Sequence, residues 1–140
     1  MDELTQKVRS IIEDMDTYAA HVGITITHAS VELGIATLPL TKDQRNGMGM
    51  AHGGAIFSLA DMAFAAASHS SGTFWVNAQS SISYLAPGRI GPLRGEARCQ
   101  RMGYTTCTYE VRILDSDDTL VALVVITGHN TKKPASLRKD

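Results

Sequence analysis

A single acid in an apolar, alanine-rich stretch is the feature of this chain that points most directly to chemistry. Asp61 lies in the run Ala-His52-Gly53-Gly-Ala-Ile-Phe-Ser-Leu-Ala-Asp61-Met-Ala-Phe-Ala-Ala-Ala-Ser. These residues favour a helix and are apolar on every side, which predicts burial. A buried carboxylate is costly unless a partner or water reaches it, and such groups beside a cleft are frequent functional residues. Asp61 is therefore a candidate catalytic group; the alternative is an acid that bonds a neighbouring backbone group and only fixes the fold.

The residues His52-Gly53-Gly54 open the same predicted helix. A helix N-terminus offers unpaired N–H groups and a partial positive charge, and glycine lets a substrate carbonyl approach the backbone closely. We therefore predict that the Gly53 N–H holds an oxyanion, although glycine at a helix start is also common for purely local reasons. His52 either shapes the Gly53 turn, the interpretation we favour, or polarises a carbonyl directly.

The spacing of these two groups has a consequence for assembly. Gly53 and Asp61 are eight residues apart, so about 12 Å of helical rise separates them. An aspartate side chain is too short to close that gap, and one carbonyl cannot touch both groups in one chain. If two central helices pack antiparallel in a two-fold dimer, Gly53 of one subunit faces Asp61 of the other. The spacing predicts a homodimer with a shared site.

Composition narrows the class of protein. The chain has 140 residues, 44% hydrophobic and 19% charged, with a formal net charge of −1. We predict one domain over residues 1–140. The charge argues against a nucleic-acid binder, and no run reaches the ~20 apolar residues of a membrane span. The acidic start and the absence of a leader predict a cytoplasmic protein. Cys99 and Cys107 are expected to be free, and the scattered histidines give no metal site.

Hydrophobic periodicity predicts the order of elements. An amphipathic helix covers about residues 3–20, and strands follow over 22–27 and 31–38. After a glycine-rich loop at 41–51, the central helix spans roughly 54–70. Four strands cover 75–85, 93–100, 107–113 and 120–126; the last is apolar on both faces, so we expect both faces to be covered. The basic tail 132–140 is expected to be frayed. This order predicts an α+β fold in which an antiparallel sheet wraps one long central helix.

Three segments carry a resemblance to a known family: Asn46 through Ala-His-Gly-Gly to Asp61, Ile82-Ser-Tyr84-Leu-Ala-Pro87, and Gly128-His-Asn-Thr131-Lys. Over about residues 5–133 the chain resembles the hotdog-fold acyl-CoA thioesterases, in particular the subgroup named for the phenylacetate-pathway enzyme. The resemblance implies a hotdog fold and hydrolysis of an acyl-CoA to free acid and coenzyme A. It also implies no metal or other cofactor, and a homodimer or dimer of dimers with the site between subunits.

Site residues follow from this resemblance. Asp61 matches the catalytic carboxylate, acting as general base or as nucleophile, and Gly53 matches the backbone oxyanion donor. Asn46 matches a polar residue that holds the water or the carbonyl, and His52 flanks the same loop. Where relatives often carry Ser or Thr on the third strand, this chain has Asn77. The neighbouring Gln79, Ser80, Ser81 or Ser83 are alternatives for that role.

Substrate contacts are expected from Asn77 and Gly54, and from Arg89, Arg101 and Lys132 at strand ends, where positive charge can meet the coenzyme A phosphates. The expected acyl group is aryl, of phenylacetyl type, or of medium chain length. Its pocket is expected to involve Ile56, Phe57, Phe64 and Trp75. Two other functions stay open: a hotdog enoyl-CoA hydratase and a non-catalytic acyl-CoA sensor.

Overall fold

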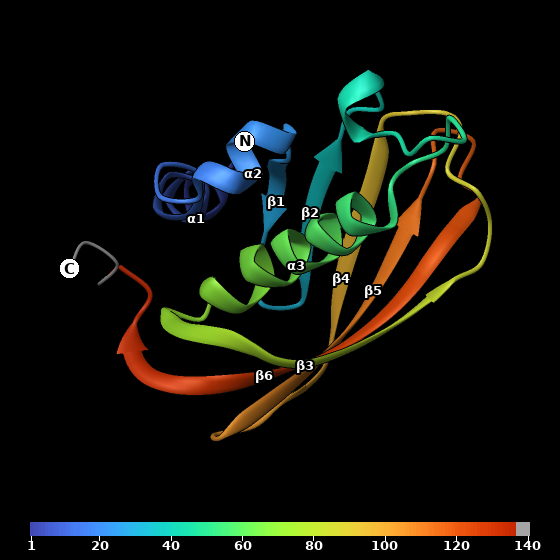
Figure 1. The fold of residues 1–140 in the computed structure, drawn as a ribbon. Coiled ribbons are helices and arrows are strands. Elements are labelled where there is room, and N and C mark those ends of the chain that lie inside the picture. The colour runs from blue at the N-terminus through green and yellow to red at the C-terminus, as the bar shows by residue number, and fades with distance from the viewer. Residues whose placement is uncertain (137–140) are drawn as a thin grey trace.

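The computed structural model describes residues 1–136. In chain order the elements are α1 (Glu3–Glu13), α2 (Thr17–Val22), β1 (Thr25–Ala29), β2 (Leu33–Leu38), the short 3-10 helix η1 (Lys42–Gln44), α3 (Gly53–His69), β3 (Thr73–Tyr84), β4 (Leu93–Met102), β5 (Thr106–Leu114) and β6 (Leu120–Pro134). The six strands form one antiparallel sheet in the order β1-β2-β4-β5-β6-β3. The sheet curves around α3 (Figure 1), which is the α+β arrangement predicted from the sequence.

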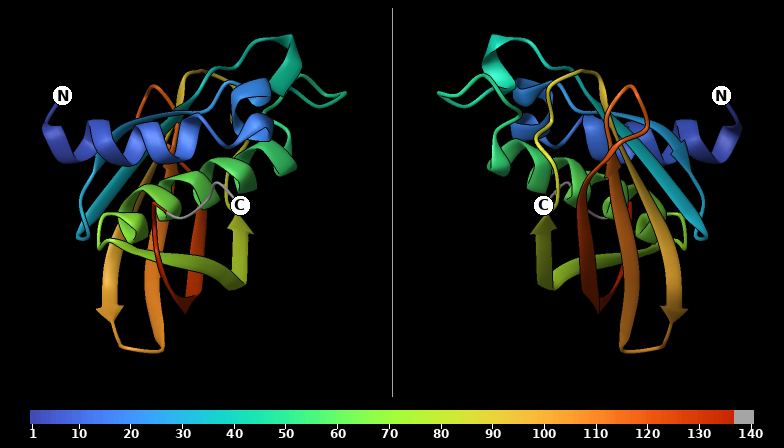
Figure 2. Two further views of the ribbon diagram at one scale, coloured as in Figure 1. Left: turned by 90° about the vertical axis from the view of Figure 1, so that its left-hand side faces the viewer. Right: turned by 90° about the vertical axis from the view of Figure 1, so that its right-hand side faces the viewer.

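The long helix α3 lies across one face of the sheet, with α1 beside the β1 edge (Figure 2). Most of its alanines are buried, and Ala63 and Ala67 are fully so. Their small size lets the strands come very close: a methyl group added to Gly34 of β2 would lie 2.7 Å from the Ala67 backbone nitrogen and still closer to the Ala63 carbonyl oxygen. The small side chains of α3 therefore allow close backbone approach at this position.

At the N-terminus the prediction of one helix over about residues 3–20 is wrong. The chain forms α1, which ends at Glu13, and a separate α2, which begins at Thr17. Asp16 caps the second helix, because its carboxylate accepts a hydrogen bond from the Ala19 N–H at 2.9 Å. Aspartate competes in this way with the helical backbone pattern, so a new helix starts where the apolar periodicity alone continues. The first strand consequently begins at Thr25 and not at residue 22.

The C-terminal strand differs from the prediction in two respects. It continues to Pro134, so Lys132 belongs to β6 and not to a frayed tail; the predicted tail residues 137–140 lie outside the described part of the chain. The expectation that both faces of 120–126 are covered is also wrong within one chain. Val124 and Ile126 are buried, but Val125 on the other face is 39% exposed, because α3 covers only the concave face. Within residues 1–136, no helix has the length and apolar character needed to cross a membrane.

Candidate active site

The N-terminus of α3 is built by His52. Its extended backbone makes it the N-cap, and its Nδ1 accepts a hydrogen bond from the Gly54 N–H at 2.9 Å. This contact is the turn-shaping role that we favoured for His52, and it occupies the Gly54 donor. The Gly53 N–H meets no acceptor in residues 1–136. One donor at the positive end of a 17-residue helix is thus left for a ligand oxygen.

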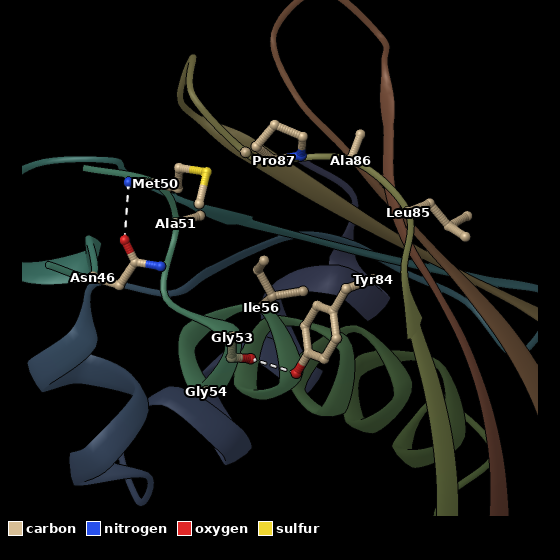
Figure 3. Close-up of a pocket in the computed structure, with 11 residues that line it drawn as sticks. Asn46, Met50, Ala51, Gly53, Gly54, Ile56, Tyr84, Leu85, Ala86 and Pro87 are labelled. Carbon is tan, nitrogen blue, oxygen red and sulfur yellow. Dashed lines mark hydrogen bonds between the residues drawn. The ribbon is translucent and has the colours of Figure 1, made fainter. Parts of the chain in front are cut away.

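Tyr84, the last residue of β3, contacts Gly53 at its carbonyl group. Its hydroxyl donates to the Gly53 carbonyl oxygen at 2.9 Å (Figure 3). The backbone at Gly53 is therefore fixed from two directions, by the His52 cap and by the Tyr84 hydroxyl. A donor fixed before the substrate arrives needs no reorganisation during the reaction.

Asn46 lies in the loop before α3, on the same hollow as Gly53. Its Oδ1 accepts hydrogen bonds from the backbone N–H groups of Met48 at 2.9 Å and Met50 at 3.2 Å. An asparagine oxygen held in this way leaves the side-chain NH₂ as the group that can donate to a ligand. Asn46 and Gly53 are thus brought together, as the sequence predicts.

The hollow itself is a cavity of about 590 Å³, which suits an organic ligand. Its walls are mostly apolar, and they come from the loop before α3, the first turn of α3 and the segment after β3. The lining residues are Asn46, Met50, Ala51, Gly53, Gly54, Ile56, Tyr84, Leu85, Ala86, Pro87 and Gly88 (Figure 3). Ile56 lines the cavity as expected. Phe64 and Trp75 are buried in the core, and neither they nor Phe57 line this cavity.

Asp61 lies two turns further along α3 and is half-buried. Its Oδ1 accepts a hydrogen bond from the Asn77 side-chain amide at 3.0 Å. Burial raises the pKa of the Asp61 carboxyl; the Asn77 hydrogen bond opposes this, and the negative charge of Asp16 adds to it. Within residues 1–136 no hydrogen bond reaches the second Asp61 oxygen, so a carboxylate with this raised pKa can take a proton from water there.

Asp61 is not among the residues that line the cavity at Gly53. Both groups nevertheless lie on the seam between α3 and β3, since Gly53 bonds Tyr84 and Asp61 bonds Asn77. β3 is an edge strand, and within residues 1–136 it pairs only with β6. The structure therefore places the two halves of the predicted site on the same open edge, separated along it.

The three predicted phosphate-binding residues are not brought together. Arg89 is exposed in the loop that joins β3 to β4, next to the cavity residues Pro87 and Gly88. Arg101 lies at the other end of β4, about 30 Å away along a strand of this length. Lys132 lies near the Arg101 end, with its ammonium 5.5 Å from the centre of the Tyr104 ring. One coenzyme A cannot use both ends of β4 in the same chain.

Sequence reasoning assigned no role to Tyr84 and treated Ser80 as only one of several alternatives. The Ser80 hydroxyl donates to the Asn77 Oδ1 at 2.8 Å. Tyr84 stands in the segment that carried the family resemblance, but its contact with Gly53 depends on the packing of β3 on α3. No local pattern reveals that contact.

Comparison with known proteins adds independent information. Residues 48–122, more than half of the chain, match the thioesterase superfamily. The acyl-coenzyme A thioesterase PaaI of Escherichia coli K12 is 35% identical over 109 residues, which cover 77% of this chain and 78% of that protein.

Solved structures agree. The E. coli PaaI protein from the phenylacetic acid degradation operon matches with a TM-score of 0.86 at 29% identity, over 94% of this chain and 96% of that chain. The smu.793 protein of Streptococcus mutans UA159, bound to acetyl-CoA, matches with a TM-score of 0.75 at 32% identity, over 80% of this chain and 91% of that chain.

Proposed function

This chain belongs to the thioesterase superfamily and is a thioester hydrolase, and we propose that its substrate is an acyl-coenzyme A whose acyl group is aryl, of phenylacetyl type, or of medium chain length. The apolar cavity beside Gly53 supports this substrate class, since an acyl chain or phenyl ring needs an apolar wall. The E. coli relative named as an acyl-coenzyme A thioesterase, from a phenylacetic acid degradation operon, supports it as well.

The observation that carries the mechanism is the placement of two groups on the α3–β3 seam. These groups are the Gly53 N–H and the Asp61 carboxylate. A water molecule gives a proton to the Asp61 carboxylate and attacks the thioester carbonyl carbon. The carbonyl oxygen becomes negatively charged and is held by the Gly53 N–H and the Asn46 side-chain amide. The intermediate then expels the coenzyme A thiolate, which takes the proton from Asp61. No metal or other cofactor enters this scheme.

Attack by the Asp61 carboxylate itself is the alternative route to the same products. It forms an acid anhydride between Asp61 and the acyl group and releases the thiolate; water then hydrolyses the anhydride. A single turnover in ¹⁸O-labelled water separates the two routes. General-base catalysis places the label only in the product acid. The anhydride route, when water attacks the Asp61 carbonyl, leaves the label in the protein.

The proposed active unit is a two-fold homodimer in which Asp61 of one subunit faces Gly53 of its partner. About 12 Å of helical rise separates the two groups within one chain, and Asp61 does not line the cavity at Gly53. The exposed edge of β3 is 12 residues long, and such an edge pairs readily with another strand. Antiparallel pairing of two β3 edges covers it and runs the two α3 helices in opposite directions. A dimer of two such dimers is compatible with this site.

Arg89 is the proposed contact for coenzyme A phosphate from the subunit that contributes Gly53, because it follows the cavity segment directly. Arg101 and Lys132 reach the same coenzyme A only from the partner subunit. Gly54 contributes by its missing side chain, since its N–H is bound to His52. The cytoplasmic location predicted from the sequence stays a prediction.

The two other functions considered from the sequence have less support. A hydratase needs an acid and a base together near the acyl β-carbon, but the His52 Nδ1 is already bound to the Gly54 N–H, where it shapes the turn. A non-catalytic sensor does not need a carboxylate held by an amide donor. Asp61 is held in this way by Asn77.

Release of free coenzyme A thiol tests the proposal. We expect wild type to hydrolyse phenylacetyl-, hydroxyphenylacetyl- or hexanoyl-CoA faster than palmitoyl-CoA. We expect Asp61→Asn to bind these esters without turning them over. Wild-type turnover by Asp61→Asn would show that Asp61 is only a structural acid.

A further inference from the structure

Strand β3 contains an irregularity directly beside the site. Its pairing with β6 shifts register between Asn77, which lies opposite Gly128, and Gln79, which lies opposite Thr127. The shift adds one residue to β3, as in a β-bulge. In a regular strand, residues three apart point to opposite faces of the sheet. After a bulge of this kind, residues three apart point to the same face.

The burial of the side chains follows this altered pattern. Asn77 and Ser80 are both half-buried on the side of α3, while Ala78, Gln79 and Ser81 are exposed. Asn77 and Ser80 are therefore side by side only because the bulge lies between them. Without the extra residue, Gln79 would take the inward position next to Asn77.

The result is a chain of three polar side chains that ends at the proposed catalytic carboxylate. The Ser80 hydroxyl donates to the Asn77 Oδ1 at 2.8 Å, and the Asn77 Nδ2 donates to the Asp61 Oδ1 at 3.0 Å. Asn77 thus uses its oxygen toward Ser80 and its nitrogen toward Asp61. Ser80 itself is 2.8 Å from Asn77 and has no hydrogen bond to Asp61.

An amide can face a carboxylate in two ways, and only one of them suits an ionised acid. An ionised carboxylate only accepts hydrogen bonds, so the amide must present its NH₂. If the amide turns over, its oxygen meets the carboxylate, and that arrangement is favourable only when Asp61 carries a proton. In the observed orientation the Ser80 hydroxyl donates to the Asn77 oxygen while the Asn77 NH₂ donates to Asp61, so both ends of the amide are held.

We propose that Ser80 is a positioning residue for thioester hydrolysis: its hydrogen bond to Asn77 stabilises the amide in the orientation that keeps Asp61 ionised and aimed at the attacking water. The proposal rests on the proposed role of Asp61. The only charged group among residues 1–136 that acts on Asp61 is Asp16, at the start of α2. Asn77 and Ser80 of β3 are uncharged, so the amide orientation is the contribution of β3 to the ionisation of Asp61.

The test is the pH dependence of kcat and KM for phenylacetyl-CoA, or the best substrate of the panel, in a set of dimeric full-length variants. Ser80→Ala removes the hydroxyl, Ser80→Thr keeps it, and Ser81→Ala removes an exposed hydroxyl on the opposite face as a matched control. We expect Ser80→Ala to lower kcat about tenfold near neutral pH, with KM unchanged. The acid limb of the kcat–pH profile of Ser80→Ala should move up by about one pH unit, because the variant loses the hydrogen bond that favours ionised Asp61. Ser80→Thr and Ser81→Ala should match wild type.

A double-mutant cycle separates positioning from a general loss of packing. If Ser80 acts through Asn77, adding Ser80→Ala to Asn77→Ala changes neither kcat nor the acid limb. An equal further loss in the Asn77→Ala background overturns the proposal, and so does a wild-type acid limb in folded Ser80→Ala. Asp61→Asn is measured beside them. If it keeps wild-type turnover, the proposed function itself fails; if it is inactive while Ser80→Ala equals wild type, only the positioning role fails.

Discussion

Replacing Gly53 by proline deletes the proposed oxyanion donor and leaves the start of α3 intact. Gly53 is the first residue of the helix, directly after the His52 N-cap. Proline is well tolerated at this position, because it lacks only an N–H that the helix does not use. The residue before proline must be extended, and His52 already has φ −66° and ψ 135°. An added Cβ lies 3.3 Å from the Tyr84 hydroxyl oxygen, at the far end of an exposed side chain that can shift.

The expected loss follows from the chemistry of a missing donor. Removing one oxyanion donor from other enzymes costs about 10²–10³ in kcat, or about 3–4 kcal/mol of transition-state stabilisation. We expect Gly53→Pro to lose at least 10² in kcat for thiol release. Gly53→Ala is the matched control, since it adds the same Cβ and keeps the N–H. If Gly53→Pro remains folded and stays within a few-fold of Gly53→Ala, the Gly53 N–H does not hold the oxyanion.

Three further predictions concern stability. His52→Ala removes the cap on the Gly54 N–H and should lower the free energy of unfolding in urea by about 1 kcal/mol, while His52→Asn should restore most of it; equal loss in both would contradict the capping role. Burial raises the pKa of Asp61 above 3.8, so ionisation costs more in the folded state and stability falls as pH rises through the window above 3.8. Asp61→Asn should therefore be more stable than wild type at neutral pH and equal to it well below 3.8; a constant difference across pH would refute this. Gly34→Ala should cost about 1–3 kcal/mol, because the Ala67 backbone cannot move aside, whereas Gly47→Ala, with open space around it, should be neutral.

The parts of the site that depend on local sequence could be predicted. The alanine-rich run gave the position of α3 to within one residue, and the His-Gly-Gly start placed the free donor at Gly53. The turn-shaping role favoured for His52 uses the same local pattern, whereas its identity as the N-cap comes from the structure. The distance between Gly53 and Asp61 also needs only the rise of a helix, which is why a shared site could be inferred without a structure.

The parts that depend on pairing between distant segments could not be predicted. The bulge in β3 exists because Asn77 and Gln79 pair with Gly128 and Thr127, about fifty residues later in the chain. Strict alternation from Trp75 places Gln79 inward and Ser80 outward, the reverse of the structure. The break between α1 and α2 was missed for a different reason: the apolar stripe continues across it, and only the cap at Asp16 marks a new helix.

Complementation between two inactive variants tests the shared site most directly. A subunit with Asp61→Asn keeps the wild-type Gly53, and a subunit with Gly53→Pro keeps the wild-type Asp61. If the site is shared, each mixed dimer has one complete site, and random equal mixing should restore about one quarter of wild-type activity. The two variants are unfolded and refolded together, and thiol release is compared with that of each variant treated alone. Activity near one quarter of wild type is the predicted result. Mixed dimers that form, as shown by two different affinity tags, but stay as inactive as their parents would contradict a site built from Gly53 of one subunit and Asp61 of the other.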